Sequence, residues 1–119
     1  GCALDARLRF GIALTVAKIA GSEYCQAGYV FFARNAGLSD EEVKDALEGT
    51  SPVRQLEVAA SFAQCLVESQ GTIEDSELDR LRDAGFSDRE IVEIIVTTGH
   101  ALTNCLLTNA LRPSIDFRP

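Results

Sequence analysis

A serine and a cysteine three residues apart are the residues of this sequence best suited to chemistry. Ser22 opens the segment Ser22-Glu23-Tyr24-Cys25, and serine is a preferred helix N-cap. With Ser22 as the N-cap, Cys25 takes the third helical position, where unpaired amides and the helix dipole favour a thiolate. Tyr29, one turn further along the same face, could donate a hydrogen bond. The spacing therefore predicts that Cys25 is a nucleophile or redox centre.

Other features favour an inert Cys25. The carboxylate of Glu23 is close in sequence and opposes a second negative charge. Cysteine is also among the most buried residue types, and a buried thiol usually only fills space. Cys65 and Cys105 lie on apolar helix faces and are expected in the core, whereas Cys2 is terminal and uninformative.

The one histidine, His100, is in an apolar segment with threonines within one helical turn. The common arrangement for such a residue is a neutral imidazole that bonds a threonine hydroxyl or a backbone carbonyl. His100 could act as an acid or base only if it lines a pocket. Because one histidine and no C-x-x-C pair make a poor ligand set, we expect no metal, and no cofactor motif is evident.

Composition predicts an acidic, folded protein with a single domain over residues 1–119. Apolar residues make up 46% of the 119 residues and charged residues 24%. The net charge of −7, with only two lysines, argues against a nucleic acid or an anionic membrane as partner.

We expect neither a signal peptide nor a membrane span. No signal peptide is visible, and the longest uncharged stretch, 94–111, carries too many polar residues for a lipid-facing span. Four cysteines without a close pair fit a reduced, cytoplasmic setting. Because the sequence begins at Gly1 and has no methionine, we expect that the natural start is missing.

Helical spacing of apolar residues runs through the whole chain, and no alternating strand pattern competes. We therefore predict an all-α fold. The predicted helices cover about 6–20, 22–36, 39–48, 51–67 and 88–111, with a further one that begins at Thr72 or Ser76. Ser51-Pro52 is interpreted as the N-cap and first residue of the fourth helix.

One helix–turn–helix joint occurs twice. Residues 84–91 repeat residues 36–43 at an offset of 48, with a glycine that ends one helix and a Ser-x-x-Glu capping box that starts the next. Two copies are too few for a solenoid. The last helix, 88–111, has apolar residues on all its faces, so we expect a neighbouring subunit to cover it and the protein to be a homo-oligomer.

The sequence resembles the carboxymuconolactone decarboxylase family, which includes the alkylhydroperoxidase D-like proteins. The most specific parts are Gly21-Ser22-Glu23-Tyr24-Cys25 and Leu102-Thr103-Asn104. Segments 4–9, 36–42, 86–91 and 115–117 extend the resemblance over essentially the whole chain. The resemblance implies a bundle of about six helices that assembles as trimers or hexamers.

The redox-active members of that family carry C-x-x-C-x-x-x-H and a glutamate one helix earlier. Only the second cysteine, which attacks peroxide, has a counterpart here, Cys25. Ser22 replaces the first cysteine, Tyr29 the histidine and Phe10 the glutamate. Serine cannot form the disulfide, tyrosine with an ordinary pKa of about 10 is a poor base, and phenylalanine relays no proton.

Three functions remain open from the sequence. The first is a peroxidase-type thiol enzyme reduced to one cysteine, with Cys25 as nucleophile, Ser22 stabilising its thiolate and Tyr29 as donor. The second is a cofactor-free lyase or isomerase that acts on a small organic acid through His100. The third is a catalytically silent protein that binds a ligand or serves in assembly. A pocket that holds His100 with a cationic wall would favour the second.

Overall fold

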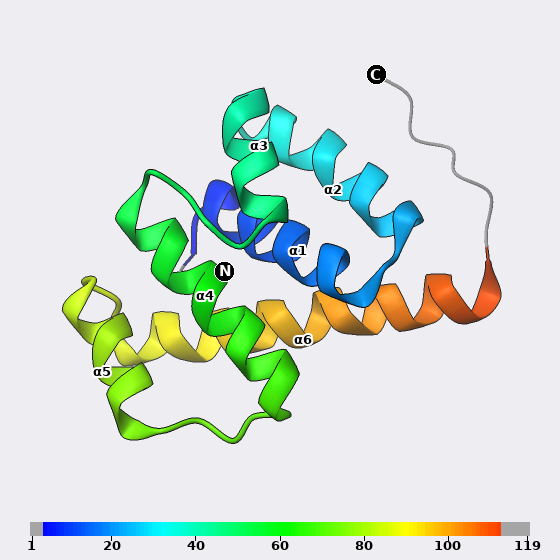
Figure 1. The fold of residues 1–119 in the computed structure, drawn as a ribbon. Helices are drawn as coiled ribbons and strands as arrows, with labels where there is room; N and C mark the ends of the chain where they lie inside the picture. Colours follow the sequence, from blue (N-terminus) through cyan, green and yellow to red (C-terminus); the bar gives the residue numbers. More distant parts are fainter. Residues whose placement is uncertain (1–3, 113–119) are drawn as a thin grey trace.

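The computed structural model describes residues 4–112, and within them the chain forms six α-helices and no strand (Figure 1). The all-α prediction is thereby confirmed. The helices are α1 (Ala6–Ala20), α2 (Glu23–Asn35), α3 (Asp40–Leu47), α4 (Arg54–Ser69), α5 (Asp75–Asp83) and α6 (Asp88–Leu111). Cys2 and the segment 115–117 lie outside the described residues.

Helix α1 is the centre of the bundle and packs against α2, α3, α4 and α6 (Figure 1). Its residues from Gly11 to Ala17 are all buried, which is why this stretch of sequence has no charged residue. Gly11 allows α4 to approach closely, because a Cβ atom there would collide with Cδ1 of Leu56. Helices α2 and α6 both pack against α1, whose middle turns are buried.

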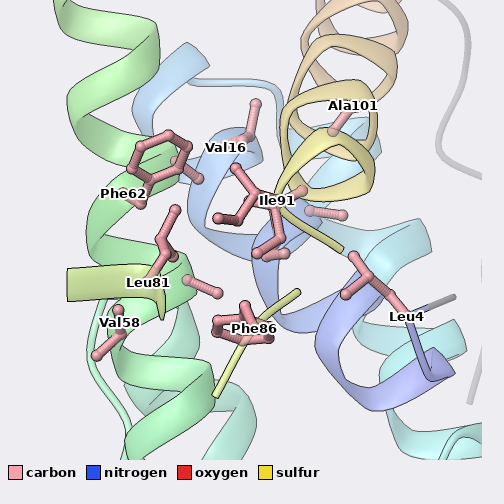
Figure 2. Close-up of a cluster of buried hydrophobic side chains, with 13 residues drawn as sticks. Leu4, Val16, Val58, Phe62, Leu81, Phe86, Ile91 and Ala101 are labelled. Carbon is pink, nitrogen blue, oxygen red and sulfur yellow. The ribbon is translucent and has the colours of Figure 1, made fainter. Parts of the chain in front are cut away.

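The hydrophobic core fills the space between α1, α4, α5 and α6 (Figure 2). Val16 of α1 and Phe62 of α4 are both buried there, and Leu81 of α5 is fully enclosed. Ile91 and Ala101 bring the first half of α6 into the same cluster. This packing fixes how α6 is rotated, and so which of its side chains turn toward α2.

The two predicted capping boxes are confirmed. The Ser39 hydroxyl accepts the Glu42 amide at 3.1 Å, and the Glu42 carboxylate accepts the Ser39 amide at 3.0 Å. Ser87 and Glu90 repeat both bonds at 3.1 and 2.9 Å. The repeat extends to an ion pair that spans each joint, from Arg34 to Asp40 and from Arg82 to Asp88.

Two predicted helix starts need correction. Helix α4 begins at Arg54, with Val53 as its N-cap, and not at Pro52. The Ser51 hydroxyl accepts the Val53 amide at 3.0 Å, so it closes a tight turn before the helix instead of capping it. Helix α5 begins at Asp75, between the two predicted starts.

One side of α6 carries large apolar side chains that stay exposed among residues 4–112. They are Val92, Ile95, Val96, Leu106, Leu107 and Leu111. By length and composition α6 is also the one described helix that could cross a membrane, a test that core helices of soluble proteins pass as well. It packs against α1, α2 and α4, and the absence of a membrane partner stays a prediction.

Candidate functional site

Cys25 lies at the start of α2, where the sequence predicts it. Ser22 is the N-cap, and its hydroxyl accepts the backbone amide of Cys25 at 3.2 Å. The turn before it is possible because Gly21 adopts a left-handed conformation with φ of 67°, which ends α1. Ser22 is 1% exposed and Cys25 is 6% exposed. The thiol is therefore held in the first turn of the helix, at the positive end of its dipole.

The hydroxyl of Thr108, near the end of α6, contacts both of these residues. Its Oγ1 lies 2.7 Å from Ser22 Oγ and 3.4 Å from Cys25 Sγ, and it donates to the Cys105 carbonyl at 3.1 Å. The hydroxyl has a single proton. When Cys25 is a thiolate, the Thr108 hydroxyl can turn toward the sulfur and donate to it, while Ser22 donates to Thr108. Thr108 was not among the residues predicted for the site.

Tyr29, one turn after Cys25, accepts a hydrogen bond at 3.0 Å from the side-chain amide of Asn104 on α6. Burial raises the pKa of the Tyr29 phenol above its ordinary value, the Asn104 bond opposes this, and nearby Cys25 and Cys105 raise it further. Tyr29 is therefore neutral at physiological pH and keeps its O–H as a donor. It is a hydrogen-bond donor and not a general base.

Cys25 and Tyr29 line a cavity of about 240 Å³ between α2 and α6. Thr108 and Asn104 give it polar atoms, and the rest of the lining is mostly apolar. The remaining lining residues are Tyr24, Gly28, Phe32 and Leu107. The sulfur atom is thus buried within the protein but borders a space that a small molecule could enter.

A second and larger groove, of about 490 Å³, runs beside the first and shares Tyr29, Phe32 and Asn104 with it. His100 lines this groove but not the cavity at Cys25. Its ring is exposed and bonds no other described residue, so the expected bond to a threonine or a carbonyl is wrong. The side chain faces the groove because the core fixes the rotation of α6.

Arg9 adds a positive charge to the same groove. Its Nε is buried and has no hydrogen-bond partner among the described residues, and its guanidinium lies 5.7 Å from the centre of the Phe10 ring. Phe10 in turn stacks on Phe32, with 5.6 Å between ring centres. Phe10, the residue expected in place of the family's glutamate, thus belongs to an aromatic wall of the groove beside the Arg9 guanidinium.

The other described cysteines differ in their surroundings. Cys105 is fully buried as predicted and belongs to a cluster with Ala17 and Cys25. Cys65 is only partly buried, so its prediction as a core residue is wrong. It faces Glu77, whose hydrogen bond raises the pKa of the Cys65 thiol. Within residues 4–112 no three histidine, cysteine or acidic side chains gather as a metal site.

Comparison with known proteins identifies the family of the chain. The model of the carboxymuconolactone decarboxylase family matches residues 1–68, more than half of the chain. The chain belongs to this family. No curated protein matches it.

Two solved structures share the fold of this family member. One is an uncharacterized peroxidase-related protein from Silicibacter sp. TM1040, with a TM-score of 0.89 and 21% identity over 98% of this chain. The chain spans 62% of that protein's length. The other is an Agrobacterium tumefaciens protein of unknown function that has been suggested to be the antioxidant defence protein AhpD. It has a TM-score of 0.81 and 25% identity, and the match covers 98% of this chain and 82% of that one.

Proposed function

We propose that this family member is a thiol-dependent hydroperoxide reductase with Cys25 as its nucleophile. The observation that carries the proposal is the position of Cys25 Sγ, in the first turn of α2, 3.4 Å from the Thr108 hydroxyl and at the wall of a cavity. Helix dipole and hydroxyl both stabilise a negative sulfur. The descriptions of the two structural neighbours support the same class of reaction.

In this reaction the Cys25 thiolate attacks the terminal oxygen of a hydroperoxide, ROOH. The S–O bond forms as the O–O bond breaks, and the leaving alkoxide takes up the proton lost from the thiol. Cys25 ends as a sulfenic acid and the substrate as an alcohol, ROH. Tyr29 borders the same cavity and donates a hydrogen bond to the departing oxygen. Because Phe32 and Leu107 make much of the lining apolar, the substrate is an organic hydroperoxide.

Steady-state reduction of cumene hydroperoxide, with dithiothreitol as the electron donor, tests the proposal. We expect turnover by the wild type and none above background by Cys25→Ser. The matched control is Cys65→Ser, because Cys65 is on α4, away from the cavity, and should leave the rate unchanged. Equal rates for wild type and Cys25→Ser would refute the role of Cys25.

A second function is favoured by the groove that holds His100 and Arg9. A cationic, apolar groove fits a small organic acid, whose carboxylate would bind the unpartnered Nε of Arg9. His100 would then act as acid or base in a cofactor-free lyase or isomerase reaction. The family name describes a reaction of this kind on a lactone acid.

Calorimetric titration with benzoate, and with benzamide as its neutral analogue, tests the organic-acid site. Preference for benzoate that disappears in Arg9→Gln would support it, and equal affinity for the two compounds would exclude it. A protein that binds benzoate yet shows no turnover on hydroperoxide would be a catalytically silent ligand-binding relative.

We also propose that a second copy of the chain covers the apolar side of α6. Val92 and Leu106 are 58% and 60% exposed there, which is unusual for a protein that is monomeric. Isologous or cyclic contacts between copies would bury this strip, and the family resemblance implies trimers or hexamers. Light scattering after gel filtration should give a multimer for the wild type and smaller species for Val92→Asp/Leu106→Asp. A monomeric wild type would contradict the assembly.

A further inference from the structure

A second thiol lies against Cys25 on the side that faces α6. Cys105 has no exposed surface and shares one buried cluster with Cys25 and Ala17. Thr108 is one turn further along α6, and its hydroxyl contacts both Cys25 Sγ and the Cys105 carbonyl. The turn of α6 from Cys105 to Thr108 therefore covers the sulfur of Cys25.

After burial, the neighbouring Cys25 is the largest cause that raises the pKa of the Cys105 thiol. Two buried thiols in one cluster, on helices that pack against each other, are candidates for a disulfide, which tolerates only short distances between the two backbones. Cys65 offers no such pairing, since it lies on α4 beside Glu77. Of the three cysteines that the structure describes, Cys105 alone can reach Cys25.

We propose that Cys105 is the resolving thiol for Cys25, in place of the cysteine that Ser22 replaces three residues earlier. This role rests on the proposed peroxide reaction of Cys25. The Cys105 sulfur attacks the sulfur of the Cys25 sulfenic acid, the S–S bond forms and the S–O bond breaks. The hydroxide that leaves takes the Cys105 proton and departs as water. An external dithiol then returns both cysteines to the reduced state.

The surroundings of Cys105 set the order of the two steps. Burial raises the pKa of its thiol to about 12, and the charge of the neighbouring Cys25 acts in the same direction. Cys105 therefore stays protonated while Cys25 reacts with the hydroperoxide. Because a sulfenic acid is neutral, oxidation of Cys25 removes one of the causes that raise the pKa of the Cys105 thiol.

The raised pKa has a measurable consequence for the second step. Burial, the largest cause of the raised pKa, remains after oxidation, so the pKa of the Cys105 thiol stays above its ordinary value. Below that pKa the fraction of Cys105 that is thiolate grows about tenfold with each pH unit. Closure of the disulfide should therefore accelerate as the pH is raised from 6 to 9. A resolving thiol with an ordinary pKa would level off near the upper end of this range.

The decisive experiment treats the full chain with one equivalent of cumene hydroperoxide and maps the cysteines by mass spectrometry. In the wild type we expect a Cys25–Cys105 disulfide, seen as the loss of two hydrogens. In Cys105→Ser we expect no such link and a dimedone adduct on Cys25 instead. Cys65→Ser is the control and should behave as the wild type. Cys105→Ala replaces the serine variant if the buried hydroxyl prevents folding.

Two failures can be told apart in the wild type alone. If dimedone traps Cys25 sulfenic acid and no link to Cys105 ever forms, the resolving role is wrong while the peroxide reaction stands. If Cys25 gives neither adduct nor disulfide, the proposed function is wrong and the resolving role falls with it. Diamide, which oxidises thiol pairs without peroxide, should still link the two cysteines, and its failure to do so would refute the pairing itself.

Discussion

Replacement of Thr108 by valine removes one hydroxyl and leaves the shape of the side chain nearly unchanged. That hydroxyl lies 2.7 Å from Ser22 Oγ and 3.4 Å from Cys25 Sγ, and it donates to the Cys105 carbonyl. Ser22 keeps the Cys25 amide but loses its second partner in a site that is 1% exposed. Because a buried polar group without a partner costs about 1–3 kcal/mol, we expect the free energy of unfolding to fall by about that amount.

The same substitution should slow the reaction of Cys25. A hydrogen bond to a charged group contributes about 1.5–3 kcal/mol net, and about 1.4 kcal/mol corresponds to a tenfold change in rate. Loss of the Thr108 donor should therefore lower the rate of peroxide oxidation of Cys25 by about tenfold or more. Urea unfolding followed by circular dichroism measures the first effect, and stopped-flow oxidation measures the second.

Thr103→Val is the matched control for this experiment. Thr103 lies on the same helix, and its hydroxyl also donates to a backbone carbonyl, that of Gly99 at 3.0 Å, but on the exposed side. Its replacement should change stability little and the rate at Cys25 not at all. If Thr108→Val matched Thr103→Val in both measurements, the assignment of Thr108 as the group that holds Cys25 would be refuted.

Three further predictions concern stability. Gly11→Ala forces a Cβ onto Leu56 and should cost about 1–3 kcal/mol, measured by urea unfolding. Gly99→Ala meets open space in α6 and should instead add up to about 1 kcal/mol, since alanine favours a helix, so equal effects would contradict the packing described. The hydrogen bond from the Ser39 amide is the main cause that lowers the pKa of the Glu42 carboxyl. The ionised carboxylate therefore stabilises the folded protein above the ordinary pKa of glutamate, and this stabilisation is lost as the pH falls through the lowered pKa. Glu42→Gln removes the negative charge, which also pairs with Arg7, so it should lose stability at pH 7 but little at pH 2, and a constant difference would show that this charge is not the cause.

Local signals were sufficient to predict the helices and the place of Cys25. Capping residues act within one turn, so Ser22, Ser39 and Ser87 could be recognised as helix starts from their immediate neighbours. The start of α4 was predicted wrongly because the Ser51 hydroxyl can accept a backbone amide either as a helix N-cap or in a turn before the helix. The sequence does not distinguish the two.

Contacts between distant residues could not be predicted in this way. Thr108 and Cys105 lie about 80 positions after Cys25, and they meet it only because core packing fixes the rotation of α6. His100 was expected to bond a threonine hydroxyl or a backbone carbonyl, yet the same rotation turns its ring into the groove. The face of a helix that meets a neighbour is decided by the whole core and not by the periodicity of one helix.

The most direct test compares two cysteines within one molecule. Less than one equivalent of cumene hydroperoxide is added to the wild-type chain, and the oxidised fractions of Cys25 and Cys65 are measured by peptide mapping. If exposure alone decided the rate of oxidation, Cys65 would react first, because it is the more accessible of the two. The interaction with Glu77 raises the pKa of the Cys65 thiol, however, whereas Cys25 lies at a helix start beside the hydroxyl groups of Ser22 and Thr108. The proposed mechanism predicts that Cys25 is oxidised before Cys65. Oxidation of Cys65 ahead of Cys25 would contradict it.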